Sequence, residues 1–385
     1  MLGAVTAHRP ALQCEFAVSG KLLIACYETP GWGGAATVAY LLYERLRRDG
    51  IAHGYINLIA RKDEAFLHRT FGINYGNPKN LPDVHNCYLD EPLWRGHDNL
   101  AAGIRQYQPD RLIGYGFIAG RLLQLAAPEI PVVMFTAGAR QLSHLIESGA
   151  VKDFVSFCRT VDSGITYPMP STHPERQAAE AAELLFIHSP LVRTAFDHLI
   201  PAVAGKTYAN NISVADFIFA EAKAFAHLSR RWQYRDIDLL FIASDWSRPE
   251  KNYRLVRKIA KQTRNLRVHI VGKVHRLCTG AQHHGVIAER EKIYDLLGRT
   301  KALVCPSRSD AAPGILFEAA AMGCNVIASR NCGNWELCNA RLLIEPFTLA
   351  SCLKKIALAQ TAPYAADDEK FRGGYRDLIE TLQAL

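Results

Sequence analysis

Short apolar runs recur along the chain, and each is followed by a turn and then by a helical pattern. Residues 22–27 form the first run, which leads into a turn rich in glycine and proline. Residues 38–46 then place apolar side chains on one helical face, and Gly50 ends that pattern. Strand, glycine-rich turn and helix are the opening unit of a parallel sheet, so the alternation predicts an α/β fold.

The apolar runs fall into two series, and each run has the unbroken apolar character of strands that are buried on both faces of a parallel sheet. The expected strands are 22–27, 54–59, 112–115, 132–136 and 184–188 in the first series, and 239–243, 268–271, 302–305 and 326–328 in the second. Helices are expected between the strands of the second series over 253–262, 291–297 and 313–322.

A chain of 385 residues is longer than one hydrophobic core usually serves. We therefore expect two Rossmann-like domains that face each other across a cleft. The first covers residues 1–203 and the second covers 204–365. A helix within 366–385 is expected to pack back on the first domain.

The composition is that of a soluble globular protein, with 49% hydrophobic and 21% charged residues. No apolar run approaches the roughly 20 residues that cross a bilayer, and the first twenty residues lack the apolar block of a signal peptide. We expect a cytoplasmic protein. The ten cysteines show no zinc-ligand spacing, so we interpret them as reduced thiols that fill the core.

The net charge of +8 suits anionic ligands, among which nucleic acid, an anionic membrane surface and phosphorylated small molecules compete. Most basic clusters have the spacing of a solvated helix face, for example Arg254, Arg257, Lys258 and Lys261. No aromatic or glycine-rich RNA-binding motif accompanies them, which argues against nucleic acid. Peripheral contact with the inner face of an anionic membrane stays open.

The most informative segment covers residues 306–329. A strand ends at Pro306, a loop carries Asp310, and Pro313 then opens a helix, where proline is well tolerated. The first backbone amides of that helix form an anion site, and they belong to Gly314, Ile315 and Leu316. Glu318 follows Asp310 by eight residues, so both carboxylates can face one cleft and accept hydrogen bonds from sugar hydroxyls.

This segment resembles the acidic-x7-acidic signature of the family 4 retaining glycosyltransferases of the GT-B fold. The matching residues are Asp310, Pro313, Glu318, Ala319, Ala321, Gly323, Val326, Ile327 and Ala328. The resemblance implies an enzyme that moves a sugar from a nucleoside-diphosphate sugar, such as a UDP- or GDP-sugar, to an acceptor with the anomeric configuration kept. Asp310 would orient the transferred sugar, and Glu318 would hold the ribose.

The resemblance extends to a second basic segment that would bind the donor diphosphate. The family places an arginine at the strand end where this chain has Ser244 and Asp245, so Arg248 would substitute for it beside Lys251. Arginine binds phosphate oxygens bidentately and lysine adds a point charge. We assign catalytic roles to Asp310, Lys251 and Arg248. The remaining donor-binding residues implied by the resemblance are Gly33, Gly34, Ser244, Gly272 and Ile287.

Two features concern the chemistry that accompanies transfer. The family often has a histidine after its threonine-bearing strand, but here Thr136 is followed by Ala137 and Gly138, and we interpret His144 as a surface or capping residue. The family generally works without a metal. We accordingly predict no metal and no cofactor besides the nucleotide-sugar co-substrate, and we interpret the sequence 236–238, Asp-Ile-Asp, as a turn before a strand.

Two alternatives to a glycosyltransferase stay open. A GT-B nucleotide-sugar epimerase would share most of these residues, and so would a non-catalytic partner subunit that binds the nucleotide sugar. The identity of the substrates is open as well. The base is not determined, and the acceptor would be a sugar, a lipid-linked molecule or a small molecule.

Overall fold

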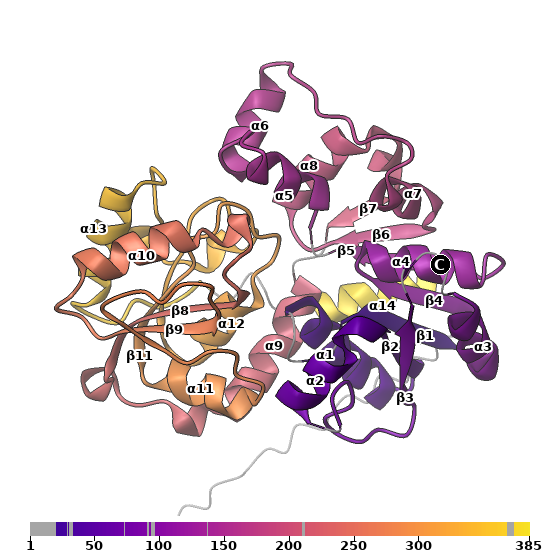
Figure 1. The fold of residues 1–385 in the computed structure, drawn as a ribbon, viewed down its shortest axis with the longest axis horizontal. Coiled ribbons are helices and arrows are strands. Elements are labelled where there is room, and N and C mark those ends of the chain that lie inside the picture. The colour runs from indigo at the N-terminus through magenta and orange to yellow at the C-terminus, as the bar shows by residue number, and fades with distance from the viewer. Residues whose placement is uncertain are drawn as a thin grey trace, which may run out of the picture.

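The structure is a computed structural model that describes residues 21–28, 30, 34–72, 74–90, 92–93, 97–136, 138–209, 212–367 and 373–385. Two parallel sheets form two α/β units (Figure 1). This confirms the predicted fold class.

The first sheet has seven strands in the order β3-β2-β1-β4-β5-β6-β7, and all neighbouring strands are parallel. Its strands are β1 (Leu22–Tyr27), β2 (Ala52–Ala60), β3 (Val84–Leu89), β4 (Arg111–Tyr115), β5 (Val132–Thr136), β6 (Leu184–Ile187) and β7 (Thr207–Ala209). β7 pairs with β6, so the first sheet extends past residue 203, where we expected the first domain to end.

The helices of the first unit follow the strands in sequence. They are α1 (Gly34–Arg48), α2 (Glu64–Phe71), α3 (Asp98–Tyr107), α4 (Phe117–Ala126), α5 (Arg140–Glu147), α6 (Phe154–Asp162), α7 (Pro174–Ala181) and α8 (Pro190–Leu199). Their apolar faces cover the sheet. The largest fully buried side chains in this unit include Tyr43, Phe135 and Phe196.

The second sheet has five parallel strands in the order β10-β9-β8-β11-β12. They are β8 (Ile237–Asp245), β9 (Val268–Lys273), β10 (Ala281–His283), β11 (Thr300–Val304) and β12 (Asn325–Ile327). The helices of this unit are α10 (Tyr253–Gln262), α11 (Arg290–Gly298), α12 (Gly314–Ala321) and α13 (Leu349–Ala359), and a single 3-10 turn, η6 (Pro249–Lys251), joins β8 to α10.

Two further helices connect the units. Helix α9 (Ile212–Ala224) contacts α1 and α12, and helix α14 (Gly374–Ala384) packs against α9 on the side of the first unit (Figure 1). The hydroxyl of Tyr375 donates a hydrogen bond to Asp49 at 2.7 Å, and Arg111 donates one to the carbonyl of Leu385 at 2.7 Å. None of the helices in the described ranges has the length and apolar character of a bilayer-crossing segment.

Candidate functional site

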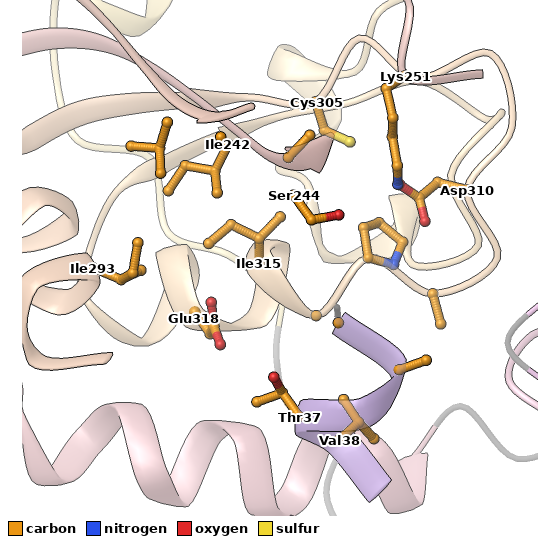
Figure 2. Close-up of a pocket in the computed structure, with 18 of the residues that line it drawn as sticks. Thr37, Val38, Ile242, Ser244, Lys251, Ile293, Cys305, Asp310, Ile315 and Glu318 are labelled. Carbon is orange, nitrogen blue, oxygen red and sulfur yellow. The ribbon is translucent and has the colours of Figure 1, made fainter. Parts of the chain in front are cut away.

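A pocket of about 350 Å³ lies between the two units. The carboxyl ends of β8, β9 and β11 and the start of α12 supply its second-unit side, and α1 supplies much of its first-unit side. In Figure 2, Thr37 and Val38 of α1 lie across from Ser244, Ile315 and Glu318. Carboxyl ends of strands at such a crevice are the usual place for ligands in α/β proteins.

Most residues predicted for the site line this one pocket. They are Gly34, Ser244, Arg248, Lys251, Gly272, Ile287, Asp310, Pro313, Gly314, Ile315 and Glu318. Gly33 lies outside the described residues. Leu316 does not line the pocket: its side chain is fully buried in the core, and its amide donates to the carbonyl of Pro313 at 3.1 Å. The predicted free amide at Leu316 was therefore wrong.

Lys251 and Asp310 form an ion pair at the pocket wall. Nζ of Lys251 lies 2.5 Å from Oδ2 of Asp310 (Figure 2). The hydroxyl of Ser307 also donates to that oxygen, at 3.3 Å. The backbone of Asp310 is fixed as well, because its amide donates to the carbonyl of Asn331 and its carbonyl accepts from the amide of Gly333. The pair brings a cation from η6 and an acid from a separate loop to one point of the pocket.

Arg248 lies beside this pair. Its Nε donates to Oε1 of Glu250 at 2.6 Å, and the Glu250 side chain is almost completely buried. The guanidinium stays about half exposed and borders both the main pocket and a neighbouring cavity of about 240 Å³. An arginine side chain has five N–H donors, so Arg248 can donate to further groups besides Glu250.

The start of α12 faces the same pocket. Pro313 is the N-cap residue, with φ of −65°, and offers no side-chain cap to the helix. The chain thus enters the helix one residue later than predicted. The amides of Gly314 and Ile315 are at the helix start, where backbone N–H groups lack intrahelical acceptors and favour anions.

Glu318 belongs to a network of charges that the sequence did not reveal. Nη2 of Arg290 donates to Oε1 of Glu318 at 2.7 Å and to Oε2 of Glu221 at 2.6 Å, and Nε of Arg290 donates to Oε1 of Glu221 at 3.0 Å. The hydroxyl of Tyr294 also donates to Glu221 at 3.0 Å. The two carboxylates raise the pKa of Arg290 above its ordinary value, so the guanidinium stays charged. Arg290 fixes one oxygen of Glu318.

The end of the pocket nearest α11 is apolar. Its lining includes Ile242, Val271, Ile287 and Ile293, and Figure 2 shows Ile242, Ile293 and Ile315 grouped on this side. Gly272 at the end of β9 has φ of +116°, and a Cβ at this position would lie 1.6 Å from the carbonyl oxygen of Ala243. Only glycine allows the two strand ends to approach so closely.

His188, directly after β6, is a pocket residue that we did not predict. Its Nε2 lies 2.7 Å from the hydroxyl of Tyr115, which also lines the pocket. Burial lowers the pKa of His188 to about 4 and raises the pKa of Tyr115 well above its usual value. At neutral pH, therefore, the imidazole is neutral and Tyr115 keeps its proton. His144 is exposed on α5 and does not line the pocket.

Glu28 follows β1 in a strained conformation, with φ of +78°, which residues other than glycine rarely adopt. Burial raises the pKa of its carboxyl, and the nearby charge of Arg248 opposes that shift. Strained backbone and a perturbed carboxyl are features of functional sites. No sequence pattern marked this residue.

The Asp-Ile-Asp sequence at the start of β8 lies at the amino end of the strand, opposite the pocket. Asp236 accepts from Nη2 of Arg299 at 2.7 Å, and Asp238 accepts from Arg267 at 3.0 Å and from Lys301 at 2.8 Å. Both carboxylates are held by cations. Within the described ranges, no group of three or more His, Cys, Asp or Glu side chains is placed to hold a metal ion.

Comparisons with known proteins agree with this architecture. The family model described as "Glycosyl transferases group 1" matches residues 236–358. No curated protein matches the chain in sequence.

Similar solved structures span nearly the whole chain at low identity. Sucrose-phosphate synthase from Thermosynechococcus elongatus is 15% identical over 94% of this chain and 94% of its own, with a TM-score of 0.57. HepE from Anabaena, solved in complex with UDP and glucose, is 14% identical over 95% of this chain and 100% of its own, with a TM-score of 0.54. UDP-GlcNAc 2-epimerase from Methanocaldococcus jannaschii is 13% identical over 95% and 100%, with a TM-score of 0.53. These likenesses establish the GT-B fold.

Proposed function

We propose that this chain is a retaining glycosyltransferase of the family 4 type, which moves a sugar from a nucleoside-diphosphate sugar to an acceptor without a metal ion. The main observation behind this proposal is that the Lys251–Asp310 pair, the start of α12 and Glu318 all line one interdomain pocket. The match of residues 236–358 to a glycosyltransferase family model supports this class, as does the likeness to HepE, which binds UDP and glucose.

In this proposal the diphosphate lies against the start of α12. The amides of Gly314 and Ile315 donate to its oxygens, and Lys251 and Arg248 neutralise its charge. Asp310 gives up part of its contact with Lys251 as the diphosphate arrives. Charge stabilisation by groups already in position is the main way in which a protein can assist departure of an anionic leaving group.

The rest of the donor extends to both sides of the diphosphate. Asp310 accepts hydrogen bonds from hydroxyls of the transferred sugar, and the free oxygen of Glu318 accepts from the ribose. The base lies at the apolar end near Ile287 and Ile293. The two carboxylates suit the hydroxyls of the sugar and the ribose, and the apolar wall suits the base.

The neighbouring cavity of about 240 Å³ receives the acceptor, because it shares Arg248, Lys251 and Asp310 with the donor pocket. The bond from the anomeric carbon to the diphosphate breaks while the acceptor oxygen bonds to the same face of the sugar. A phosphate oxygen of the leaving group takes the acceptor proton. The protein supplies position and charge, and the cations and the helix start act in place of a divalent ion.

Binding of nucleoside diphosphates tests the site directly. A panel of UDP, GDP, ADP and TDP is screened for thermal stabilisation, since a ligand at 100 times its Kd adds about 2.7 kcal/mol of stability. We expect one of them to stabilise the protein and Lys251→Ala to abolish that effect. Lys261→Ala is the matched control, because Lys261 is exposed on α10 and does not line the pocket.

Turnover then separates the alternatives. Transfer of the sugar to an added acceptor supports the proposal, with the anomeric configuration of the product assigned by NMR. Conversion of the nucleotide sugar without an acceptor favours the epimerase, whose structure is also similar. Binding without turnover favours a partner subunit. Failure of every nucleoside diphosphate to bind, or equal binding by Lys251→Ala and the wild type, refutes the site.

A further inference from the structure

A second cavity, of about 270 Å³, lies between the start of α6 and the starts of α10 and α13. It shares no lining residue with the donor pocket, but adjacent residues of the chain line the two cavities. Lys251 lines the donor pocket and Asn252 lines this cavity. The same holds for Ser307 and Arg308. We refer to it as the α6–α10 cavity. The proposed sugar transfer uses none of its residues.

The charge around this cavity is strongly positive. Four basic side chains line it, and they are Lys152, Arg254, Lys258 and Arg308. The one acid, Asp153, is buried and caps α6 by accepting from the amide of Ser156 at 2.8 Å. In the described part of the chain, none of these four basic side chains forms an ion pair or a hydrogen bond with another residue. No ion pair within the described residues therefore balances their charge.

Three helix starts add to this positive charge. The N-cap residues of α6, α10 and α13 all line the cavity, and they are Asp153, Asn252 and Thr348. Figure 1 shows α10 and α13 as neighbours on the second unit. The amino end of a helix carries a partial positive charge that favours anions.

Helix α10 places basic residues where local electrostatics favours acids. Its first turn contains Arg254 and no acid, and Lys258 follows four residues later on the same face. A cation at a helix start and a like-charge pair at this spacing both destabilise a helix. Residues that violate local preferences without a compensating partner are expected at functional sites. An anion in the cavity would be that partner.

The site also joins the two units. Lys152 comes from the first unit, and the other three cations come from the second. Directly beside them, the amide of Phe154 donates to the carbonyl of Arg308 at 2.8 Å, and the amide of Val155 donates to Oδ1 of Asn331 at 2.9 Å. A ligand held by Lys152 and Arg308 would therefore reinforce an existing contact between the units.

We propose that the α6–α10 cavity binds a phosphate group that carries two negative charges. Two arginines can each bind such a group through paired N–H donors, and two lysines add charge. The phosphate is carried either by a soluble phosphorylated molecule or by the headgroup of a phosphorylated lipid. The inference goes beyond the proposed transfer reaction and does not depend on it.

Two double variants on the same helix test the site. Arg254→Gln/Lys258→Gln removes two charges from the cavity, whereas Arg257→Gln/Lys261→Gln removes two charges from residues that do not line it. Glutamine keeps high helix propensity at each position, and circular dichroism checks that all proteins are folded. Inorganic phosphate is titrated by calorimetry, and sedimentation measures binding to phosphatidylcholine vesicles with and without phosphatidic acid.

We expect the wild type and Arg257→Gln/Lys261→Gln to bind alike, and Arg254→Gln/Lys258→Gln to bind about tenfold more weakly or worse, given the Coulomb energy of two lost contacts. Weakened phosphate binding identifies a soluble ligand, and weakened vesicle binding alone identifies a lipid headgroup. Equal binding by the two double variants overturns the proposal, because any anion would then be bound elsewhere, including at the donor pocket. The proposal is also overturned if the wild type binds neither inorganic phosphate nor the vesicles with phosphatidic acid.

Discussion

Glu318→Gln tests the ribose contact, because it keeps the shape of the side chain and removes its charge. One oxygen of Glu318 accepts from Arg290 at 2.7 Å, which leaves the other oxygen for a ligand in the pocket. A glutamine amide has one accepting oxygen and one donating nitrogen. It cannot accept from Arg290 and also accept from a ribose hydroxyl with the second atom.

The expected loss follows from that count. A hydrogen bond to a charged group contributes about 1.5–3 kcal/mol, so one lost bond weakens binding about 10- to 150-fold. We expect this loss in Glu318→Gln for a ribonucleoside diphosphate and little change for its 2′,3′-dideoxy analogue. Isothermal titration calorimetry with the two nucleotides measures the ratio of their Kd values.

Glu221→Gln provides the control. Glu221 accepts from the same guanidinium at 2.6 Å but does not line the pocket. This variant should lower the stability of the protein while leaving the ratio of the two Kd values as in the wild type. The assignment fails if Glu318→Gln weakens both nucleotides equally, or if Glu221→Gln changes the ratio to the same extent.

Three further substitutions, together with Gly205→Ala as a control, probe the framework of the site. Gly272→Ala should destabilise the fold by at least about 1–3 kcal/mol, because its φ of +116° and a Cβ placed 1.6 Å from the Ala243 carbonyl oxygen force the backbone to move. Gly205→Ala, with no atom within 4 Å of the new Cβ, should change thermal stability by less than about 0.5 kcal/mol. The pKa of His188 is about 4 in the folded protein against 6.5 for the free side chain, so the unfolded chain takes up the proton first as pH falls. The free energy of unfolding of the wild type, measured by denaturant titration, should then fall by about 2 kcal/mol between pH 6.5 and 5. The free energy of unfolding of His188→Gln should not show this part of the pH dependence. Leu316→Ala removes a fully buried side chain and should lower the free energy of unfolding by about 2–5 kcal/mol. The folded variant should keep its affinity for nucleoside diphosphates. A loss of affinity without a loss of stability would show that Leu316 belongs to the binding site.

The strands that the sequence predicted are the ones buried on both faces, because burial makes them continuous apolar runs. The unpredicted strands β3, β7 and β10 are all sheet edges. β7 and β10 have three residues each, and β3 has the mixed sequence VHNCYL. β3 and β10 are partly exposed, so they carry a weaker apolar pattern, whereas the edge strand β12 is fully buried and was predicted.

The sequence predicted the site residues that are close together along the chain and missed those that come from distant segments. Residues 310–318 lie on one loop and one helix, so their spacing alone indicated that they would meet. Arg290 and His188 reach the pocket from α11 and from the end of β6, and nothing near them in sequence points there. The error at Leu316 came from placing the helix start one residue too early, which is the usual uncertainty of helix boundaries.

The position of α14 has a consequence for the order in which the protein folds during synthesis. Residues 237–359 contain every strand of the second sheet and helices α10 to α13, so that unit can close as soon as it leaves the ribosome. The first unit lacks α14 until residues 374–384 emerge, and Leu378, Ile379 and Leu382 of this helix are buried in a core cluster to which both units contribute. The unit translated first is therefore the unit completed last, and its apolar surface near α1 and α9 needs protection in the interval.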